Sequence, residues 1–151
     1  MSAEEKLKNL GFELTQPAAA AANYIPANRT GNTIYISGQI SADANGVIKG
    51  TLGQDMDVAA GQQAAAQCAL SILSHIVHSA GVPLDDIKKT IKLTVLVAST
   101  PDFTEQHLVA NGASDLLVEV LGENGRHARA AFGVVALPLG AAVEIEAIVE
   151  V

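Results

Sequence analysis

The sequence of 151 residues contains no tryptophan, and aromatic residues make up only 3% of it. Hydrophobic residues nevertheless make up 49%, so the core has to be built from Ala, Val, Ile and Leu. This length and this hydrophobic content exclude a disordered chain and favour one domain over two. We therefore predict a single domain that spans residues 1–151.

Cysteine is almost absent as well. The single Cys68 excludes a disulfide bond within the chain and is compatible with a reducing compartment. No hydrophobic run approaches the roughly 20 residues of a membrane span. The charged residues 1–12 lack the hydrophobic stretch of a signal peptide. We therefore predict a cytoplasmic protein with no membrane partner.

Basic charge is scarce. The chain has 9 Lys and Arg against 16 Asp and Glu, a net charge of −7, and its longest basic run is Lys88-Lys89. Proteins that bind nucleic acid draw most of their affinity from Lys and Arg that neutralise phosphates, so we predict no nucleic-acid partner. The sequence also lacks paired metal-binding motifs. His75 and His78 share a helix face without a third ligand nearby, so we predict no metal site.

What the chain does contain is regular periodicity. Apolar residues at helical spacing predict two long helices, one over residues 57–80 and one that starts at the N-cap signal Thr100-Pro101-Asp102. A short helix is predicted over residues 3–10, ending at Gly11. Alternating patterns predict strands. These cover residues 32–41, 88–99 (with Ile91, Leu93, Val95 and Val97 on one face), 128–137 and 142–151, and the Asn45-Gly46 turn joins two more.

This order of elements predicts an α+β domain in which two helices pack on one face of a mixed sheet. Cys68 falls in the apolar stripe of the first long helix, which favours a packing role. Residues 130–137 carry no charge and are typical of a strand buried on both faces. Arg129 lies at the start of this strand, and His127 shares its face. The residues alone leave open whether Arg129 is solvated or is a fixed cation at a pocket edge.

The last strand alternates acids with apolar residues, a pattern typical of one solvated and one buried face. If residues 128–137 and 142–151 paired as a hairpin, Arg129 would lie near residue 149 and not beside Glu144. The two side chains would then meet only if these strands are not hairpin neighbours, or at a subunit interface.

Three short segments occur in a characteristic order. They are "ISGQIS", "ARAAFGVVALP" and "VEIEAI". In this, the chain resembles the YjgF-like family of reactive-intermediate (enamine/imine) deaminases, also filed under an older endoribonuclease L-PSP label. The resemblance covers about residues 12–151 and leaves residues 1–11 as an N-terminal extension. It implies a chorismate-mutase-like α+β fold that forms a homotrimer, with ligand clefts between the subunits.

The resemblance also implies roles for individual residues. Arg129 matches the family's clamp for a substrate carboxylate, and Glu144 matches the residue that positions or activates water. The backbone carbonyl of Ala131 corresponds to one that faces the substrate nitrogen, although many members carry Cys there. Four further residues match other substrate-binding positions of the cleft; these are Tyr24, Ser37, Gly38 and Asn111.

The activity implied is hydrolysis of small 2-imino and 2-enamino acids to 2-keto acids and ammonia, without a metal or an organic cofactor. The alternative is a non-enzymatic protein that binds small carboxylates such as keto acids. RNA cleavage, the older label, is disfavoured by the charge of −7. His127 and Asn23 stand where many members have Pro, and residues 42–50 form a longer region. These departures resemble a longer subgroup of the family.

Overall fold

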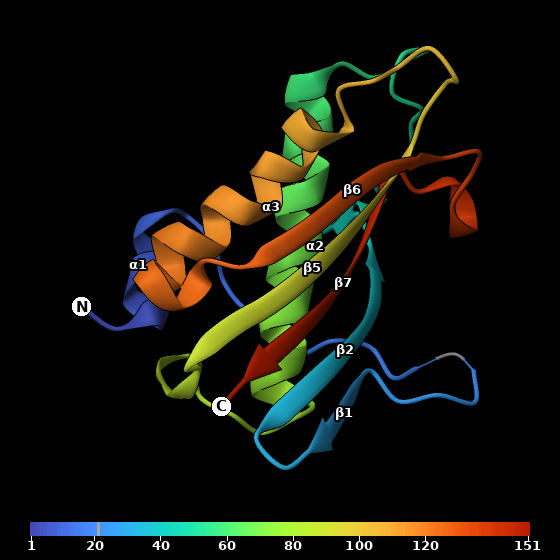
Figure 1. Ribbon diagram of the computed structural model, residues 1–151. Helices are drawn as coiled ribbons and strands as arrows, with labels where there is room; N and C mark the ends of the chain where they lie inside the picture. The colour runs from blue at the N-terminus through green and yellow to red at the C-terminus, as the bar shows by residue number, and fades with distance from the viewer. Residues whose placement is uncertain (21) are drawn as a thin grey trace.

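In the computed structural model, which describes residues 1–20 and 22–151, five strands form one mixed sheet and helices cover one of its faces (Figure 1). The strands β5 and β6 run parallel, and all other neighbours in the sheet run antiparallel. The predicted α+β architecture with a mixed sheet is therefore confirmed. The order across the sheet is β1 (Ala27–Thr30), β2 (Thr33–Ile40), β7 (Val143–Glu150), β5 (Lys89–Ala98) and β6 (Ala128–Val134).

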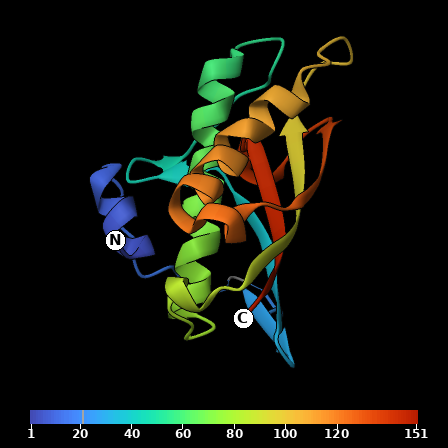
Figure 2. The same ribbon diagram turned by 60° about the vertical axis from the view of Figure 1, so that its left-hand side comes forward.

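Two long helices, α2 (Val58–His78) and α3 (Gln106–Leu121), lie across the same face of the sheet, and the short α1 (Ala3–Asn9) packs beside α3 (Figures 1 and 2). Both predicted apolar stripes are buried, as expected for helices that cover a sheet. Among the described residues, no helix is both long enough and apolar enough to cross a membrane. The shorter elements are β3 (Ala42–Asp43), β4 (Gly46–Val47) and the 3-10 turns η1 (Leu84–Asp86), η2 (Gly122–Gly125) and η3 (Pro138–Gly140).

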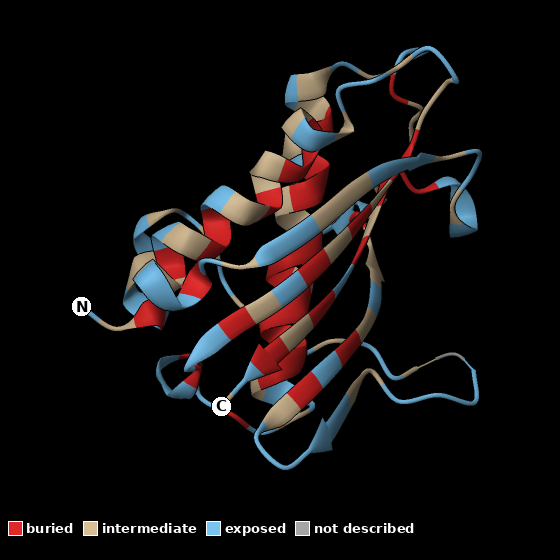
Figure 3. Cartoon of the chain, viewed as in Figure 1, coloured by how far each residue is buried: buried red, intermediate tan, exposed pale blue. Residues whose placement is uncertain are grey.

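The sheet has a face packed on the helices and an open face. Alternate residues of β7, such as Val143 and Ile145, are fully buried against the helices, while Glu144 and Glu146 turn the other way. The alternation is visible along β5 and β7 in Figure 3. The open face carries the aromatic side chain of Tyr35, which is 49% exposed, and it is hollowed by a shallow depression of about 530 Å³.

The prediction that residues 130–137 form a strand buried on both faces is wrong. The strand β6 ends at Val134, and its residues are exposed or half-buried (Figure 3). Because β6 is an edge strand whose one neighbour among residues 1–20 and 22–151 is β5, no layer of these described residues covers its open face. Phe132 on that face is 46% exposed. The strand is apolar as the sequence indicates, but the described part of the chain leaves its open face uncovered.

Two further predictions need correction. The helix α3 begins at Gln106 and not at Thr100-Pro101-Asp102. The Thr100 N–H donates to the Leu52 carbonyl and extends the bridge beside the end of β5, and the Phe103 N–H donates to the Thr100 carbonyl in one turn that does not continue as a helix. In β5, Ile91 does not share the buried face, because a bulge at this position makes it an extra residue between two paired neighbours and Thr90 is buried instead.

The two long helices approach each other at Gly112. A Cβ atom at this position would overlap the backbone of Gln62 on α2, which no side-chain rotation can relieve. The Gln62 side chain also donates to the Leu108 carbonyl of α3 at 2.9 Å. The close approach therefore requires glycine.

We expect Gly112→Ala to lower the free energy of unfolding by about 3 kcal/mol, because the helices must move apart and lose packing along their whole contact. Urea unfolding followed by circular dichroism measures the change. Asp115→Ala, at an exposed position of the same helix, serves as the control and is expected to change stability by less than about 0.5 kcal/mol. Equal stability of the Gly112→Ala variant and the parent would contradict the close approach.

Candidate functional site

The side chain of Arg129 lies against α3. In the parallel pairing of β5 and β6, Arg129 stands opposite Leu93, which is buried under the helices, so both side chains point to the helix-covered face. Its Nη1 donates to Asn111 Oδ1 at 3.0 Å and to Ser114 Oγ at 3.0 Å. Its Nη2 donates to the backbone carbonyl of His107 at 3.2 Å. Three positions on one face of α3 therefore hold one end of the guanidinium.

The other edge of this guanidinium is free. An Arg side chain has five N–H donors in a planar fork. Both donors of Nη1 and one of Nη2 are used by α3, which leaves the Nε donor and the second Nη2 donor without a partner among residues 1–20 and 22–151. Two such donors side by side match the two oxygens of a carboxylate. The arrangement is a cation that is fixed at one end and open to a ligand at the other.

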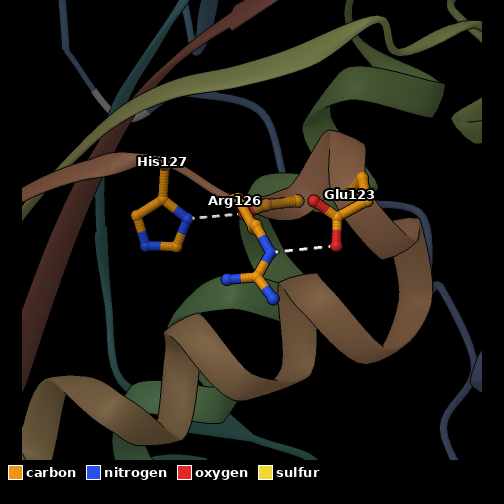
Figure 4. Close-up of polar contacts among 4 residues, drawn as sticks. Glu123, Arg126 and His127 are labelled. Carbon is orange, nitrogen blue, oxygen red and sulfur yellow. Dashed lines mark hydrogen bonds and ion pairs between the residues drawn. The ribbon is translucent and has the colours of Figure 1, made fainter.

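A hydrogen-bonded chain continues from Arg129 through Ser114 to His127. Ser114 Oγ lies 2.9 Å from Nε2 of His127, and His127 Nδ1 lies 2.6 Å from the backbone carbonyl of Gly125. Figure 4 shows the His127 ring apart from the neighbouring Arg126, whose Nε pairs with Glu123 Oε1 at 3.0 Å. Burial lowers the pKa of His127, and the nearby positive charge of Arg129 lowers it further, although the bond to Gly125 acts in the opposite sense. The lowered pKa favours the neutral form of the ring.

The second candidate acid–base group, Glu144, lies at the other side of the sheet beside Gly38. A Cβ atom on Gly38 would overlap Oε1 of Glu144, so glycine leaves the space in which the carboxylate sits. Burial raises the pKa of Glu144, and the like charge of Glu146 raises it further. A carboxyl group with a raised pKa is suited to take up and return a proton near neutral pH.

The remaining predicted residues lie in both regions. Tyr24 and Ser37 line the depression on the open face, where the Ser37 hydroxyl donates to the Ile25 carbonyl at 2.8 Å. Ala131 lies two residues after Arg129 in β6, is half-buried and stands opposite Val95 of β5. Asn111 is brought to Arg129 directly.

The structure therefore forms two groups of predicted residues and does not join them within one chain. The strands β6 and β7 are not a hairpin, because β5 lies between them. Arg129 is level with Leu93 of β5 and Glu144 with Leu96, so the two are offset by about 10 Å along the strands and about 10 Å across them. Their side chains also point to opposite faces. In this arrangement Arg129 and Glu144 of one chain do not face a common site.

Two groups around Arg129 were not predicted from the sequence: the Ser114 hydroxyl and the His107 carbonyl. The available signal was spacing, because positions 107, 111 and 114 follow the three- and four-residue steps that place residues on one helix face. Such a pattern is polar and common on solvated helix faces. The pattern indicates three partners for Arg129 only when β6 is known to lie beside α3.

Metal-binding side chains do not gather elsewhere in the described ranges. Within residues 1–20 and 22–151, no three His, Cys, Asp or Glu side chains lie close enough together to hold an ion. Nδ1 of His75 lies 2.8 Å from the Ser79 hydroxyl, a bond within the end of α2.

Cys68 is fully buried between α2 and the sheet, where its thiol donates to the Val143 carbonyl at 3.5 Å. Burial raises the pKa of this thiol far above its ordinary range, and the charge of Glu144 raises it further, so it stays protonated and unreactive. We expect Cys68→Ala to cost about 1 kcal/mol of stability and to leave any catalytic rate within a few-fold. Unfolding titrations and rate measurements check both; a large loss of rate in a folded variant would indicate thiol chemistry.

Comparisons with known proteins place these residues in context. The sequence profile of the family described as endoribonuclease L-PSP matches residues 14–151. Protein TCP17 of Trypanosoma cruzi is 48% identical over 95% of this chain and 91% of its own length. The 2-iminobutanoate/2-iminopropanoate deaminase of Mus musculus is 36% identical over 89% of this chain and 85% of its own length. A crystal structure of a protein of unknown function from Agrobacterium tumefaciens is 49% identical, with a TM-score of 0.92 over 99% of this chain and 92% of that one.

Proposed function

The chain belongs to the endoribonuclease L-PSP family, the family of the YjgF-like imine deaminases, and on this premise we propose that it hydrolyses small 2-imino and 2-enamino acids to 2-keto acids and ammonia. The observation that carries the proposal is the guanidinium of Arg129, fixed at one end by α3 and open at the other. All of these substrates carry a carboxylate next to the reacting carbon. A bidentate ion pair with Arg129 places that carbon at a defined distance from the protein.

The reaction requires little further machinery. A 2-enamino acid first becomes the imine by moving a proton from its nitrogen to C3. Water then adds to the electrophilic C2 of the imine, and one of its protons moves to the nitrogen to give a carbinolamine. The hydroxyl proton moves to the amino group as the C–N bond breaks, and the products are a keto acid and ammonia. Glu144 takes the proton from the attacking water and returns it to the leaving nitrogen. The raised pKa of Glu144, caused first by burial and then by Glu146, supports this role.

The two groups reach one substrate between subunits. Arg129 of one chain faces the ligand together with Glu144, Gly38, Ser37 and Tyr24 of a neighbour in a cyclic homotrimer. The separation of Arg129 and Glu144 within one chain and the exposed aromatic side chains of Tyr35 and Phe132 on the open face of the sheet support this arrangement. Light scattering at micromolar concentration is expected to give three times the mass of the chain. A stable monomer would remove the shared site.

The activity is tested with imino acids that an amino-acid oxidase or a dehydratase generates in the cuvette. Addition of the protein is expected to accelerate release of the keto acid, followed by a coupled dehydrogenase. Imines also hydrolyse in water without a catalyst, so the rate has to exceed that of an equal amount of a folded Arg129→Ala variant. Equal rates for the two proteins would contradict the proposal.

A second function uses the same cation without turnover. A protein that binds small keto acids needs the free edge of Arg129 but no proton transfer, so tight binding of 2-oxobutanoate with no acceleration of hydrolysis would select this alternative. RNA cleavage, which the family description suggests, is disfavoured by the net charge of −7.

A further inference from the structure

The side chains behind Arg129 form a chain of hydrogen bonds whose direction is fixed by its far end. The carbonyl of Gly125 can only accept, so Nδ1 of His127 carries the hydrogen that spans these 2.6 Å. In the neutral ring Nε2 is then an acceptor. The Ser114 hydroxyl therefore donates to Nε2, and its oxygen lone pairs remain for the Nη1 donor of Arg129.

The position of the far end is itself restricted by packing. Gly125 is buried at the end of η2, and a Cβ atom on it would overlap the backbone of Leu117 on α3. The acceptor carbonyl is thus fixed to the same helix that carries Ser114 and Asn111. One rigid element supports every partner of the occupied end of the guanidinium.

We propose that Ser114 and His127 are positioning residues for Arg129: neutral His127, protonated on Nδ1, orients the Ser114 hydroxyl so that its oxygen holds the guanidinium with the free edge outward. The inference rests on the proposed role of Arg129 as a carboxylate clamp. If the Ser114 hydroxyl could turn, its hydrogen would point at the Nη1 donor, and the two positive ends would repel. His127 removes that alternative.

Loss of the Ser114 contact leaves Arg129 with two other partners on α3. Asn111 and Ser114 share Nη1, whereas the His107 carbonyl holds Nη2. Loss of the Ser114 bond leaves the guanidinium attached but free to rotate about its remaining contacts. Binding of a carboxylate should therefore weaken, while the chemical step on substrate that is already bound should change little.

The test is the affinity for 2-oxobutanoate, measured by calorimetry, in Ser114→Ala, His127→Phe and the double variant. Each single change is expected to weaken binding about fivefold, because the guanidinium keeps its charge and its other two partners but is held less firmly, and to raise KM with little change in kcat. Because the two residues act in series, the double variant should be no weaker than Ser114→Ala alone. Ser114→Thr, which keeps the hydroxyl, should restore the affinity, and His78→Phe, at an exposed position of α2, is the control.

A second readout does not depend on activity. The 15N chemical shifts of the His127 ring at pH 7 are expected to report a protonated Nδ1 and an unprotonated Nε2. A charged ring, the opposite tautomer, or additive effects in the double variant would overturn the inference. If Arg129→Ala loses keto-acid binding while Ser114→Ala and His127→Phe keep it, only the positioning role fails. If Arg129→Ala binds as tightly as the parent, the clamp and the positioning role both fail.

Discussion

Replacing Arg129 by Ala is expected to lower kcat/KM for imine hydrolysis about a hundredfold, because a charged hydrogen-bonded contact worth about 3 kcal/mol is lost. Arg129→Lys keeps the charge but not the planar fork. A lysine ammonium on β6 cannot contact Asn111 and Ser114 and also present two donors to a carboxylate, so we expect an intermediate loss. Initial rates and keto-acid affinities for both variants provide the measurement.

The chain supplies a matched control for this result. Arg126 lies three residues earlier and is bonded to the exposed Glu123, a surface pair that contributes less than about 1 kcal/mol. Arg126→Ala removes the same side chain and charge without touching α3, and its activity should equal that of the parent. Arg129→Ala has to remain folded and in the same oligomeric state as the parent for the comparison to hold. Keto-acid binding by Arg129→Ala at the parental affinity would exclude the clamp.

The long helix α2 shows what local periodicity can predict. Residues 57–80 were expected from the apolar stripe, and Val58–His78 form the helix, with Asp57 as its N-cap. The Asp57 side chain accepts from the Ala60 backbone at 2.8 Å. The apolar stripe and the N-cap both lie within the helix and its ends, so distant contacts are not needed to predict it.

The start of α3 shows where such signals fail. Thr100-Pro101-Asp102 has the composition of a helix N-terminus, but the backbone of Thr100 is engaged by Leu52, nearly 50 residues earlier. The bulge at Ile91 is of the same kind, because it is set by pairing with β7. At Ile91 the pairing with a distant strand decides against the local pattern, and at Thr100 the local signal produces one turn but not the start of the helix.

The residues of the candidate site also fall into those that the sequence predicts and those that only the structure reveals. Arg129, Asn111, Glu144 and Gly38 were named from a resemblance to a family, and the structure brings Arg129 to Asn111 and Glu144 to Gly38. The contact between Ser114 and Arg129 could not be predicted from the sequence. A serine on a helix indicates no binding role until the side chain opposite it, here Arg129 on β6, is known. No pattern in a single chain could state which surfaces meet in an assembly.

The second large effect is expected at Glu144. Glu144→Gln keeps the size of the side chain and its hydrogen-bonding capacity but cannot accept a proton, so kcat should fall about a hundredfold while keto-acid affinity survives. Gly38→Ala is an independent change with the same target, since its methyl group overlaps Oε1 and displaces the carboxylate. A parental rate for Glu144→Gln would return Glu144 to the solvated face that its alternation suggests.

The pH dependence gives this role a specific signature. If hydrolysis requires the Glu144 carboxylate, kcat/KM should fall as the pH drops through a pKa above the ordinary value for glutamate. Burial is the larger cause of that raised pKa and the charge of Glu146 the smaller. Glu146→Gln removes a like charge, which favours the ionised form of Glu144, so the acid limb should move to lower pH without disappearing. An unchanged limb would assign it to another group.

Mixing the two inactive variants tests whether Arg129 and Glu144 act across a subunit boundary. In a cyclic trimer each site would take Arg129 from one chain and Glu144 from the next, so every mixed trimer of Arg129→Ala and Glu144→Gln chains contains one intact site. Random assembly from equal amounts makes about three quarters of the trimers mixed, which restores about one quarter of the parental activity. The variants are unfolded and refolded together, and each alone is the control. Activity that stays at the level of the separate variants, in trimers shown by mass to be mixed, would mean that both groups serve a site within one chain. Such a site would require β6 and β7 to leave the positions on either side of β5 that they occupy here.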